Sequence, residues 1–207
     1  MQTYLFNNNQ KTNKEISIEL ASSINGLEIY FDFITKNEEN KLLSLIDNQS
    51  WLNDLTRRVQ HYGYKYDYRS RKIDNSFYLG ELPDWLKEIA TRLQNENKLN
   101  FIPDQAIINE YEPGQGIASH IDCEPCFDDT IISLSLGSTC IMNFTREVSG
   151  IEKVPILFEP RTLVIMKGES RYNWYHGIPA RKSDKFNDNL IKRSRRVSIT
   201  FRKVIKS

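Results

Sequence analysis

The sequence predicts a mostly β protein with flanking helices, an α+β fold in which two N-terminal helices pack against a C-terminal β core. Two observations favour this class. From residue 105 onward, short runs rich in β-branched and aromatic residues are separated by turn residues, a pattern typical of a sandwich or a jelly roll. Upstream of residue 105, two segments repeat their apolar residues at helical spacing. A chain of 207 residues suits one domain of this kind.

The start of the chain gives weak structural signals. Residues 1–25 are expected to form a weakly structured lead-in that begins rich in asparagine. Residues 26–207 are expected to form a single domain, because no linker-like stretch divides them. The first element of that domain is a predicted strand over residues 26–31, where β-branched and aromatic residues follow a glycine.

Two helices are predicted next. Thr35 and Glu38 have the spacing of a capping box, and the apolar residues after them predict a helix over residues 36–48. Between residues 82 and 93 the apolar side chains fall on one helical face, and Pro83 stands near the start of that segment. Both helices are therefore expected to pack against the β core.

The β core is predicted from six runs of strand-forming residues. These runs are 106–111, 131–136, 140–144, 156–158, 162–166 and 197–204. The alternation is clearest in the sequence RVSITFR, which begins at Arg196 and ends at Arg202. The two arginines are an even number of residues apart, so both side chains should project from the same face of the strand.

The composition is that of an ordinary soluble globular protein, with 39% hydrophobic and 27% charged residues. No apolar run approaches the ~18–20 residues that a membrane helix needs. The N-terminus lacks the basic start and apolar stretch of a secretory signal, so a cytoplasmic location is expected.

The three cysteines are expected to be reduced thiols, since they are few and odd in number in a chain without a secretory signal. Cys123 and Cys126 form a lone C-x-x-C motif, and Cys140 stands apart. A structural zinc site usually needs a second ligand pair, and a redox motif a thioredoxin-like context. Neither is present, so Cys123 and Cys126 are interpreted as incidental loop residues.

The net charge of +1 is unevenly distributed. Residues 181–207 contain ten Lys and Arg residues against two Asp residues, a net charge of +8. A basic segment of this kind can contact phosphates, and residues 192–195 (KRSR) are the candidates for such contacts. The alternative is a charged loop tip in solvent.

Three residues are candidate metal ligands. His120 and Asp122 are two residues apart in a strand-like segment, so their side chains should point to one side. His176 follows a predicted strand and supplies a third donor, whereas His61 is interpreted as a surface or lid residue. Two histidines and one carboxylate form the facial triad of non-haem Fe(II) oxygenases, which leaves metal positions open for oxygen and a bidentate cosubstrate. Taken alone, however, the H-x-D motif is weak.

A second group of residues could bind an anionic cosubstrate. 2-Oxoglutarate has two carboxylates, and a guanidinium on Arg196 or Arg202 offers a planar, permanently charged partner for one of them. Two arginines that face a β core are costly to bury unless they are paired. The alternative is that one or both face solvent on an edge strand.

Five motifs in one order resemble the AlkB family of Fe(II)- and 2-oxoglutarate-dependent dioxygenases. They are residues 109–114 (NEYEPG), 120–122 (HID), 132–137 (ISLSLG), 168–178 (GESRYNWYHGI) and 196–202 (RVSITFR). The resemblance covers about residues 105–204 and extends more weakly back to residue 27. It implies a double-stranded β-helix (jelly-roll) core in which the three candidate ligands hold Fe(II).

The resemblance also assigns residues to 2-oxoglutarate. The implied cofactor-binding residues are Asn109, Tyr111, Arg196 and Arg202. Arg196 and Tyr111 would take the far carboxylate, and the other two would lie near the end that chelates iron. One position departs from the family pattern, because some members have Asn where this chain has Ser198. Serine still donates a hydrogen bond, so the departure concerns a detail of the site.

Within the family, the chain is most similar to the branch that hydroxylates a modified wobble uridine in tRNA. The residues behind this are 57–64 (RRVQHYGY), 109–117 (NEYEPGQGI), 168–172 (GESRY) and 200–204 (TFRKV). Members of that branch can carry an RNA-recognition module before the oxygenase domain and a methyltransferase after it. This chain is too short for either and is expected to be a stand-alone oxygenase. The implied partner is tRNA or single-stranded RNA, and a monomer is assumed.

The region before the second helix is expected to contact the substrate. Tyrosines at 62, 64, 66 and 68 occupy alternate positions, which would put all four on one face of an extended strand. Aromatic rings among basic residues suit base stacking and phosphate contact. The candidate substrate-binding residues are Arg57, Tyr62, Tyr64 and Arg171. The alternative is a β-hairpin whose tyrosines pack on the core.

Three alternatives to the wobble-uridine hydroxylase remain open. An oxidative demethylase of N-alkylated bases in RNA or DNA would use the same site. A non-catalytic jelly-roll binding module that has kept the pocket belongs to another class, and the complete set of site residues disfavours it. A protein hydroxylase is the third alternative, and the segment rich in tyrosine and basic residues disfavours it.

Overall fold

The first element of the described residues is a helix, in the segment where a weakly structured lead-in was expected. The computed structural model describes residues 11–53, 56–67, 73, 75–96, 98–147 and 150–205. Within these ranges α1 spans Asn13–Ser22, so the expectation for the lead-in is wrong there. The Thr12 hydroxyl accepts from the Glu15 N–H, and the Glu15 carboxylate accepts from the Thr12 N–H. This capping box satisfies N–H groups that the first turn leaves free, and it is visible in the sequence as T-x-x-E.

Six antiparallel strands form the larger sheet. Their spatial order is β1, β8, β5, β12, β3 and β2. They span, in that order, Leu27–Tyr30, Leu163–Met166, Ile131–Gly137, Arg196–Arg202, Gln105–Tyr111 and Val59–Tyr62. Five of them fall on predicted strands. The sixth, β2, ends at Tyr62, the first of the alternating tyrosines. The C-terminal strand β12 pairs with both β5 and β3, so the last strand of the chain lies inside the sheet.

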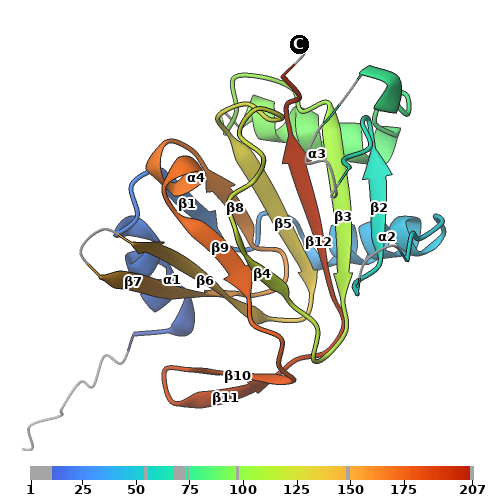
Figure 1. Ribbon diagram of the computed structural model, residues 1–207. Coiled ribbons are helices and arrows are strands. Elements are labelled where there is room, and N and C mark those ends of the chain that lie inside the picture. Colours follow the sequence, from blue (N-terminus) through green and yellow to red (C-terminus); the bar gives the residue numbers. More distant parts are fainter. Residues whose placement is uncertain are drawn as a thin grey trace, which may run out of the picture.

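A second, four-stranded antiparallel sheet faces the first (Figure 1). In spatial order it consists of β4 (Ile117–His120), β9 (Tyr175–Ile178), β6 (Cys140–Glu147) and β7 (Ile151–Phe158). The short helix α4 (Glu169–Tyr172) precedes β9, and the hairpin of β10 (Ser183–Phe186) and β11 (Asn189–Lys192) follows it. The chain crosses repeatedly between two facing antiparallel sheets, which is the jelly-roll arrangement. The predicted fold class is confirmed.

Two helices cover the outer face of the six-stranded sheet, behind it in Figure 1. They are α2 (Lys36–Asp47) and α3 (Asp84–Asn95), which agree with the predicted segments to within two residues, and a short 3₁₀ turn, η1 (Asn75–Phe77), precedes α3. The predicted capping box at the start of α2 is confirmed, because Thr35 and Glu38 exchange both hydrogen bonds. The buried side chains of these helices share one apolar core with the sheet.

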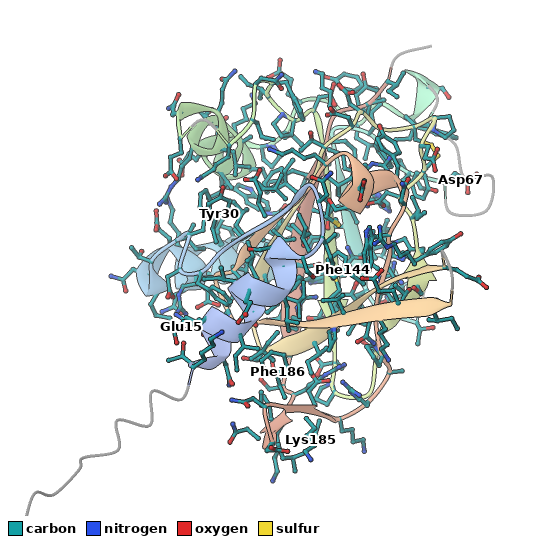
Figure 2. The ribbon with its side chains drawn as sticks, turned by 90° about the vertical axis from the view of Figure 1, so that its left-hand side faces the viewer. Glu15, Tyr30, Asp67, Phe144, Lys185 and Phe186 are labelled. Carbon is teal, nitrogen blue, oxygen red and sulfur yellow. A yellow bond between two sulfur atoms is a disulfide. The ribbon has the colours of Figure 1, made fainter. Side chains whose placement is uncertain are left out.

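Helix α1 lies on the outer face of the other sheet. Figure 2 shows it crossing in front of the strands, with the β10–β11 hairpin and Phe186 near one end. Ile16 and Leu20 of α1 pack with Ile141 of β6, Leu157 of β7 and Phe186 of β10. No helix in the described ranges is long and apolar enough to cross a membrane.

The space between the sheets is lined by one face of β12. Arg196, Ser198, Thr200 and Arg202 line this space, while the residues between them belong to the apolar core under the helices. The period of two in RVSITFR therefore separates an apolar outer face from a polar inner face. The prediction that both arginines face the same side, and face inward, is confirmed.

Candidate active site

The candidate site is a cavity of about 730 Å³ between the two sheets. Strands β3, β5 and β12 of the larger sheet and β4 and β9 of the smaller sheet contribute to its wall. The lining includes all seven residues that the sequence assigned to metal and 2-oxoglutarate, namely Asn109, Tyr111, His120, Asp122, His176, Arg196 and Arg202. The fold thus gathers residues that are almost 100 positions apart in the sequence.

The two candidate histidines lie side by side on neighbouring strands. His120 of β4 is paired with His176 of β9, and the two ring centroids are 4.5 Å apart. The Nδ1 of His120 lies 2.8 Å from the carbonyl oxygen of Ala118. Since a carbonyl only accepts, Nδ1 donates this hydrogen bond, which leaves Nε2 as the ring nitrogen that can face a metal, as in many metal-binding histidines. Burial lowers the pKa of His176 to about 3, so this imidazole is neutral and also able to act as a ligand.

Asp122 lies just beyond the end of β4 and is held by Arg202. The Nη2 of Arg202 donates to Oδ1 of Asp122 over 2.8 Å, and both side chains are buried. Burial alone would raise the pKa of this carboxyl, but the charge of Arg202 and the nearby histidines lower it to about 2. Asp122 is therefore a carboxylate at neutral pH.

These side chains are close together without yet forming a complete ligand shell. Across the described part of the chain, no three His, Cys, Asp or Glu side chains make up a ready metal-binding group. One oxygen of the Asp122 carboxylate is bonded to Arg202. The donor set nevertheless fits Fe(II), because two imidazoles and one carboxylate line one part of the same cavity.

Arg196 provides a binding site for an anion. Its Nε donates to the Ser135 hydroxyl over 2.9 Å, and its guanidinium carbon lies 5.4 Å from the ring centre of Tyr111. Its Nη1 and Nη2 are buried and have no hydrogen-bond partner among the described residues. Nε and Nη1 of Arg202 are likewise buried and unpartnered there. Buried guanidinium groups without partners are costly, so these atoms fit a ligand with two carboxylates.

Asn109 and Tyr111 follow one another on the inner face of β3. The amide oxygen of Asn109 accepts from Nε of Arg57 over 2.8 Å, and Arg57, a candidate substrate-binding residue, lines the cavity. Tyr111 is buried, and burial raises the pKa of its hydroxyl, so this group stays protonated and can donate a hydrogen bond.

The expected face of four tyrosines is not formed. Tyr62 packs edge-on against Trp85 of α3 on the outer side of the larger sheet. Tyr64 packs against Tyr78, whereas Tyr66 lines the cavity and packs against Phe127. Gly63 has a φ of +74°, which ends the regular strand between the first two tyrosines. Tyr62 and Tyr64 therefore do not line the cavity, and Tyr68 lies outside the described residues.

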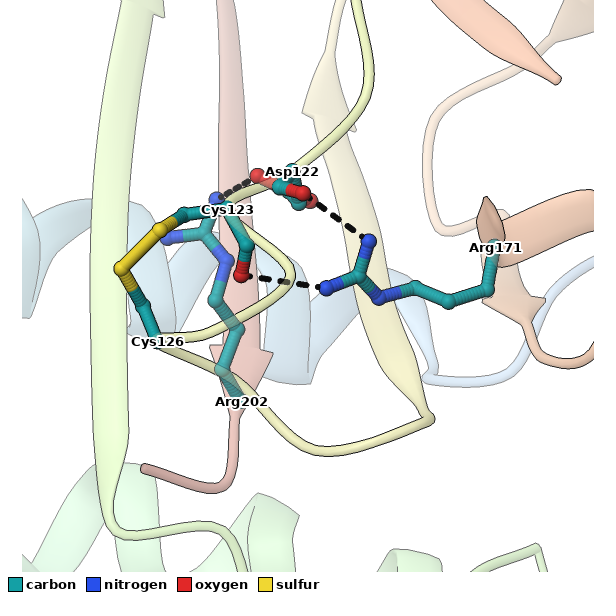
Figure 3. Close-up of a disulfide and its surroundings, with 5 residues drawn as sticks. All are labelled: Asp122, Cys123, Cys126, Arg171 and Arg202. Atoms are coloured by element: carbon teal, nitrogen blue, oxygen red, sulfur yellow. Dashed lines mark hydrogen bonds and ion pairs between the residues drawn. A yellow bond between two sulfur atoms is a disulfide. The ribbon is translucent and has the colours of Figure 1, made fainter. Parts of the chain in front are cut away.

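Arg171 is buried rather than available to substrate. Its Nη1 donates to the carbonyl of Asp122 over 3.0 Å, and its Nη2 donates to the carbonyl of Cys123 over 3.2 Å. The side chain reaches from α4 to the loop after β4 (Figure 3). Arg171 therefore contacts the backbone of Asp122 and can hold it in position, whereas a contact with substrate was expected.

The expectation of three reduced cysteines is wrong. Cys123 and Cys126 form a disulfide, and only Cys140 is a free, buried thiol (Figure 3). Two residues lie between the cysteines in the sequence, and the tight turn that they form brings the two Cα atoms to 5.3 Å. Sequence spacing alone could not establish this turn.

The basic segment near the C-terminus is largely paired internally. Arg193 is buried and bonded to Asp184, and Arg195 is bonded to Glu110 and Asp47. Of residues 192–195, only Lys192 keeps an exposed basic side chain without a described ion pair. The expectation that this segment contacts phosphates is therefore wrong for its two arginines.

The sequence analysis did not assign two serines to the site. Ser135 holds Arg196, and Ser133 lines the cavity two residues before it on β5. Both alternate with buried Ile132 and Leu134. Small polar residues at every second position of an otherwise apolar strand were the available signal, because they mark the face that meets a polar cavity.

The chain matches the family model described as the 2OG-Fe(II) oxygenase superfamily over residues 26–202. It therefore belongs to this superfamily and is a 2-oxoglutarate-dependent dioxygenase, which leaves the non-catalytic binding module without support. The cofactors of the superfamily are Fe(II) and 2-oxoglutarate, and the side chains described above fit both.

Among known proteins, the chain is similar to members of the AlkB family. It is 39% identical to protein L905 of Acanthamoeba polyphaga mimivirus, covering 93% of this chain and 91% of that protein. It is 39% identical to the "Alkylated DNA repair protein ALKBH8 homolog" of Arabidopsis thaliana, covering 90% and 60% of the two chains. It is 40% identical to the mouse "tRNA (carboxymethyluridine(34)-5-O)-methyltransferase ALKBH8", covering 86% of this chain but 30% of that protein.

Solved structures agree with the fold. The structure of OsALKBH1 superposes with a TM-score of 0.63 at 19% identity, covering 86% of this chain and 96% of that one. A prolyl hydroxylase of Trichoplax adhaerens superposes with a TM-score of 0.53 at 13% identity, covering 94% of both chains. At such low identities the likeness concerns the fold alone. The family match and the sequence relatives identify the chain as an AlkB-family oxygenase close to the ALKBH8 branch.

Proposed function

We propose that this protein hydroxylates a modified wobble uridine in tRNA, with Fe(II) held by His120, Asp122 and His176. The observation that carries the chemistry is the pair of buried Nη groups of Arg196, which have no hydrogen-bond partner among the described residues and lie in the same cavity as the candidate ligands. The cofactor-binding residues are Arg196 and Tyr111 at the far carboxylate, with Asn109 and Arg202 nearer the iron end.

The protein orients the reactants and excludes water from them. When bound, Fe(II) and 2-oxoglutarate supply an oxidation that uses O₂ and converts 2-oxoglutarate to succinate and carbon dioxide. The two Nη groups of Arg196 would hold the far carboxylate of the cosubstrate, and the Ser135 hydroxyl orients Arg196 by accepting from its Nε. Met142, Phe158 and Val164 line the cavity with apolar surface, which keeps water from the reacting groups.

The relatives support a nucleic-acid substrate. The printed name of the mouse relative refers to uridine 34 of tRNA, and that of the Arabidopsis relative to alkylated DNA repair. This chain spans only 30% of the mouse protein, so the methyltransferase activity in that name is not transferred. Arg57 at the cavity provides a cationic contact for a base or phosphate, and an unpaired anticodon loop presents its base at low cost.

An oxidative demethylase is the second candidate. A Caenorhabditis elegans protein named "DNA N6-methyl adenine demethylase" is 26% identical over 199 residues. The same cavity and cofactors would serve that reaction. The product depends on the atom to which the oxidised carbon is attached. If that atom is carbon, the hydroxyl group persists. If it is nitrogen, the hydroxylated group is released as formaldehyde.

Mass spectrometry of tRNA nucleosides tests the proposal. The protein is incubated aerobically with tRNA, Fe(II), ascorbate and 2-oxoglutarate, and we expect one modified uridine to gain one oxygen. Asp122→Ala removes a ligand and should abolish the change, whereas the matched control Asp128→Ala alters an exposed carboxylate and should retain it. Circular dichroism checks that both variants are folded.

Other outcomes decide between the candidates. Loss of a methyl group from a base, with formaldehyde released, would establish the demethylase instead. Succinate formation without any change in a nucleoside would remove the case for tRNA. Succinate formation that continues in Asp122→Ala would show that Asp122 is not a ligand.

A further inference from the structure

A disulfide lies directly beside a candidate iron ligand. Cys123 follows Asp122 in the chain and is bonded to Cys126 (Figure 3). Both cysteines are buried, while Glu124 and Pro125 between them are exposed. Cys123 also lines the cofactor cavity. A small reductant that enters the cavity therefore reaches the residue that carries one of the two sulfur atoms.

The disulfide joins two parts of the site, in addition to the backbone hydrogen bonds that the N–H groups of Cys126 and Phe127 donate to the Cys123 carbonyl. On one side, Arg202 bonds the Asp122 carboxylate and Arg171 bonds the Asp122 carbonyl. On the other side, the carbonyl of Cys126 accepts from the N–H of Ile205, just beyond β12. Because β12 also carries Arg202, the disulfide links the residue after Asp122 to the end of the strand that holds its carboxylate.

Opening this disulfide is expected to change the turn locally and not the stability of the whole fold. A disulfide restricts the unfolded chain less when it closes a short loop, and only two residues lie between these cysteines. Opening it should therefore leave the jelly roll folded. Its main consequence is greater freedom of the turn at residues 123–126, which continues directly from Asp122.

We propose that the Cys123–Cys126 pair is a reversible redox site that sets the affinity of the cavity for a divalent metal. Opening the bond takes two electrons and two protons, so that one S–S bond becomes two S–H groups. The electrons come from a dithiol, which is itself oxidised to a disulfide. The closed form holds Asp122 in place, and the open form binds metal more weakly. This inference rests on the proposed role of Asp122 as a ligand.

The expected size of the effect follows from other metal sites. Residues that position a ligand typically change metal affinity by about 10–100-fold when they are altered. Arg171 and Arg202 continue to hold Asp122 after reduction, so a change near the lower end, about 10-fold, is expected.

The test follows thiols and metal binding on the full-length protein. Wild-type protein is equilibrated in oxidised and reduced dithiothreitol at graded ratios, free thiols are trapped with N-ethylmaleimide, and the peptide with both cysteines is weighed by mass spectrometry. Calorimetry then measures binding of Mn(II), in the presence of 2-oxoglutarate and without oxygen, to the closed and the open form. We expect about 10-fold weaker binding to the open form.

Two variants complete the design. Cys123→Ser/Cys126→Ser should bind Mn(II) as weakly as the open form and should not respond to the dithiol. Cys140→Ser keeps the pair and should respond like the wild type. A pair that fails to open while the protein stays folded, or equal Mn(II) affinity in both forms, overturns the redox site. If Asp122→Ala binds Mn(II) as well as the wild type, the ligand assignment fails and this inference fails with it; if only the dithiol response is missing, the proposed ligands stand.

Discussion

At the scale of single residues, the two arginines of β12 have different environments although they share one face. Arg202 is neutralised by Asp122, whereas the Nη atoms of Arg196 have no described partner. A buried guanidinium without a carboxylate loses hydration that the protein does not replace. A binding function explains such a residue, because an anionic ligand that pairs with the guanidinium replaces the interactions with water that the side chain loses on folding.

The first prediction concerns Arg196→Met. Loss of a bidentate, charge-assisted contact should weaken 2-oxoglutarate binding by at least about 100-fold, since each ~1.4 kcal/mol corresponds to a factor of ten. The free energy of unfolding should stay equal or rise, because an unpaired buried charge is removed. Calorimetry with Mn(II) and 2-oxoglutarate measures the first quantity, and urea denaturation the second.

Arg195→Met is the matched control for this prediction. Arg195 precedes Arg196 but bonds Glu110 and Asp47 away from the cavity. Its loss should reduce stability slightly and leave 2-oxoglutarate binding unchanged. Equal loss of binding in the two variants would contradict the assigned role of Arg196.

At the scale of elements, the distance between the candidate histidines depends on how closely β4 approaches β9. Gly177 follows His176, and a Cβ atom there would lie 2.9 Å from backbone atoms of Ser119. Such a distance is too short for a carbon contact, so only glycine allows the two strands to lie this close. Ser119 in turn directly precedes His120.

The second prediction is therefore that Gly177→Ala moves β4 away from β9. Overpacking of this kind should lower the free energy of unfolding by about 1–3 kcal/mol. It should also weaken Mn(II) binding, because His120 moves with β4. Thermal denaturation and calorimetry measure the two effects. Unchanged Mn(II) affinity in a variant that is clearly destabilised would show that the histidine spacing is not limiting.

At the scale of the whole molecule, buried carboxylates join the layers. Glu39 of α2 accepts from the N–H of Gly137 at the end of β5 and from Arg161. Asp184 of the β10–β11 hairpin accepts from the N–H of Ile141 on β6 and from Arg193. A helix and a hairpin on the outside of the jelly roll are thus each fixed to a sheet by a buried ion pair.

The third prediction concerns acid stability. Burial alone would raise the pKa of Glu39 and Asp184, but their hydrogen bonds to N–H groups and to basic side chains lower both pKa values below the ordinary range. The unfolded chain then binds more protons than the folded chain as the pH falls below about 4.5. Their stabilisation is fully present above that pH and is lost as the pH falls through the folded-state pKa values.

Urea denaturation at pH 7, 5 and 4 measures this dependence. Each pKa unit corresponds to about 1.4 kcal/mol, and pH 4 lies close to the ordinary pKa of these carboxyls, so a loss of about 1 kcal/mol is expected at pH 4. Glu39→Gln should be less stable at pH 7 and should lose less on acidification. A wild-type midpoint that stays constant down to pH 4 would contradict the prediction.

The sequence by itself determined the local elements and the chemistry of the site. Apolar periodicity gave α2, α3 and most strands, because each buries one face against the core. The alternation in β12 placed both arginines on one face of the strand, and the fold turned that face toward the cavity. The resemblance to the AlkB family selected the seven cavity residues, all of which the fold brings to one cavity.

Only the tertiary structure decided which of these groups are paired. The run of alternating tyrosines is interrupted at Gly63. Arg171 donates a hydrogen bond to the backbone of Asp122. Arg193 and Arg195 form ion pairs with Asp184 and Glu110. The disulfide likewise depends on a turn whose shape is set by contacts with the segment after β12. The physical reason is the same in each case: periodicity fixes the face on which a side chain lies, whereas its partner depends on which distant strand or loop packs against that face.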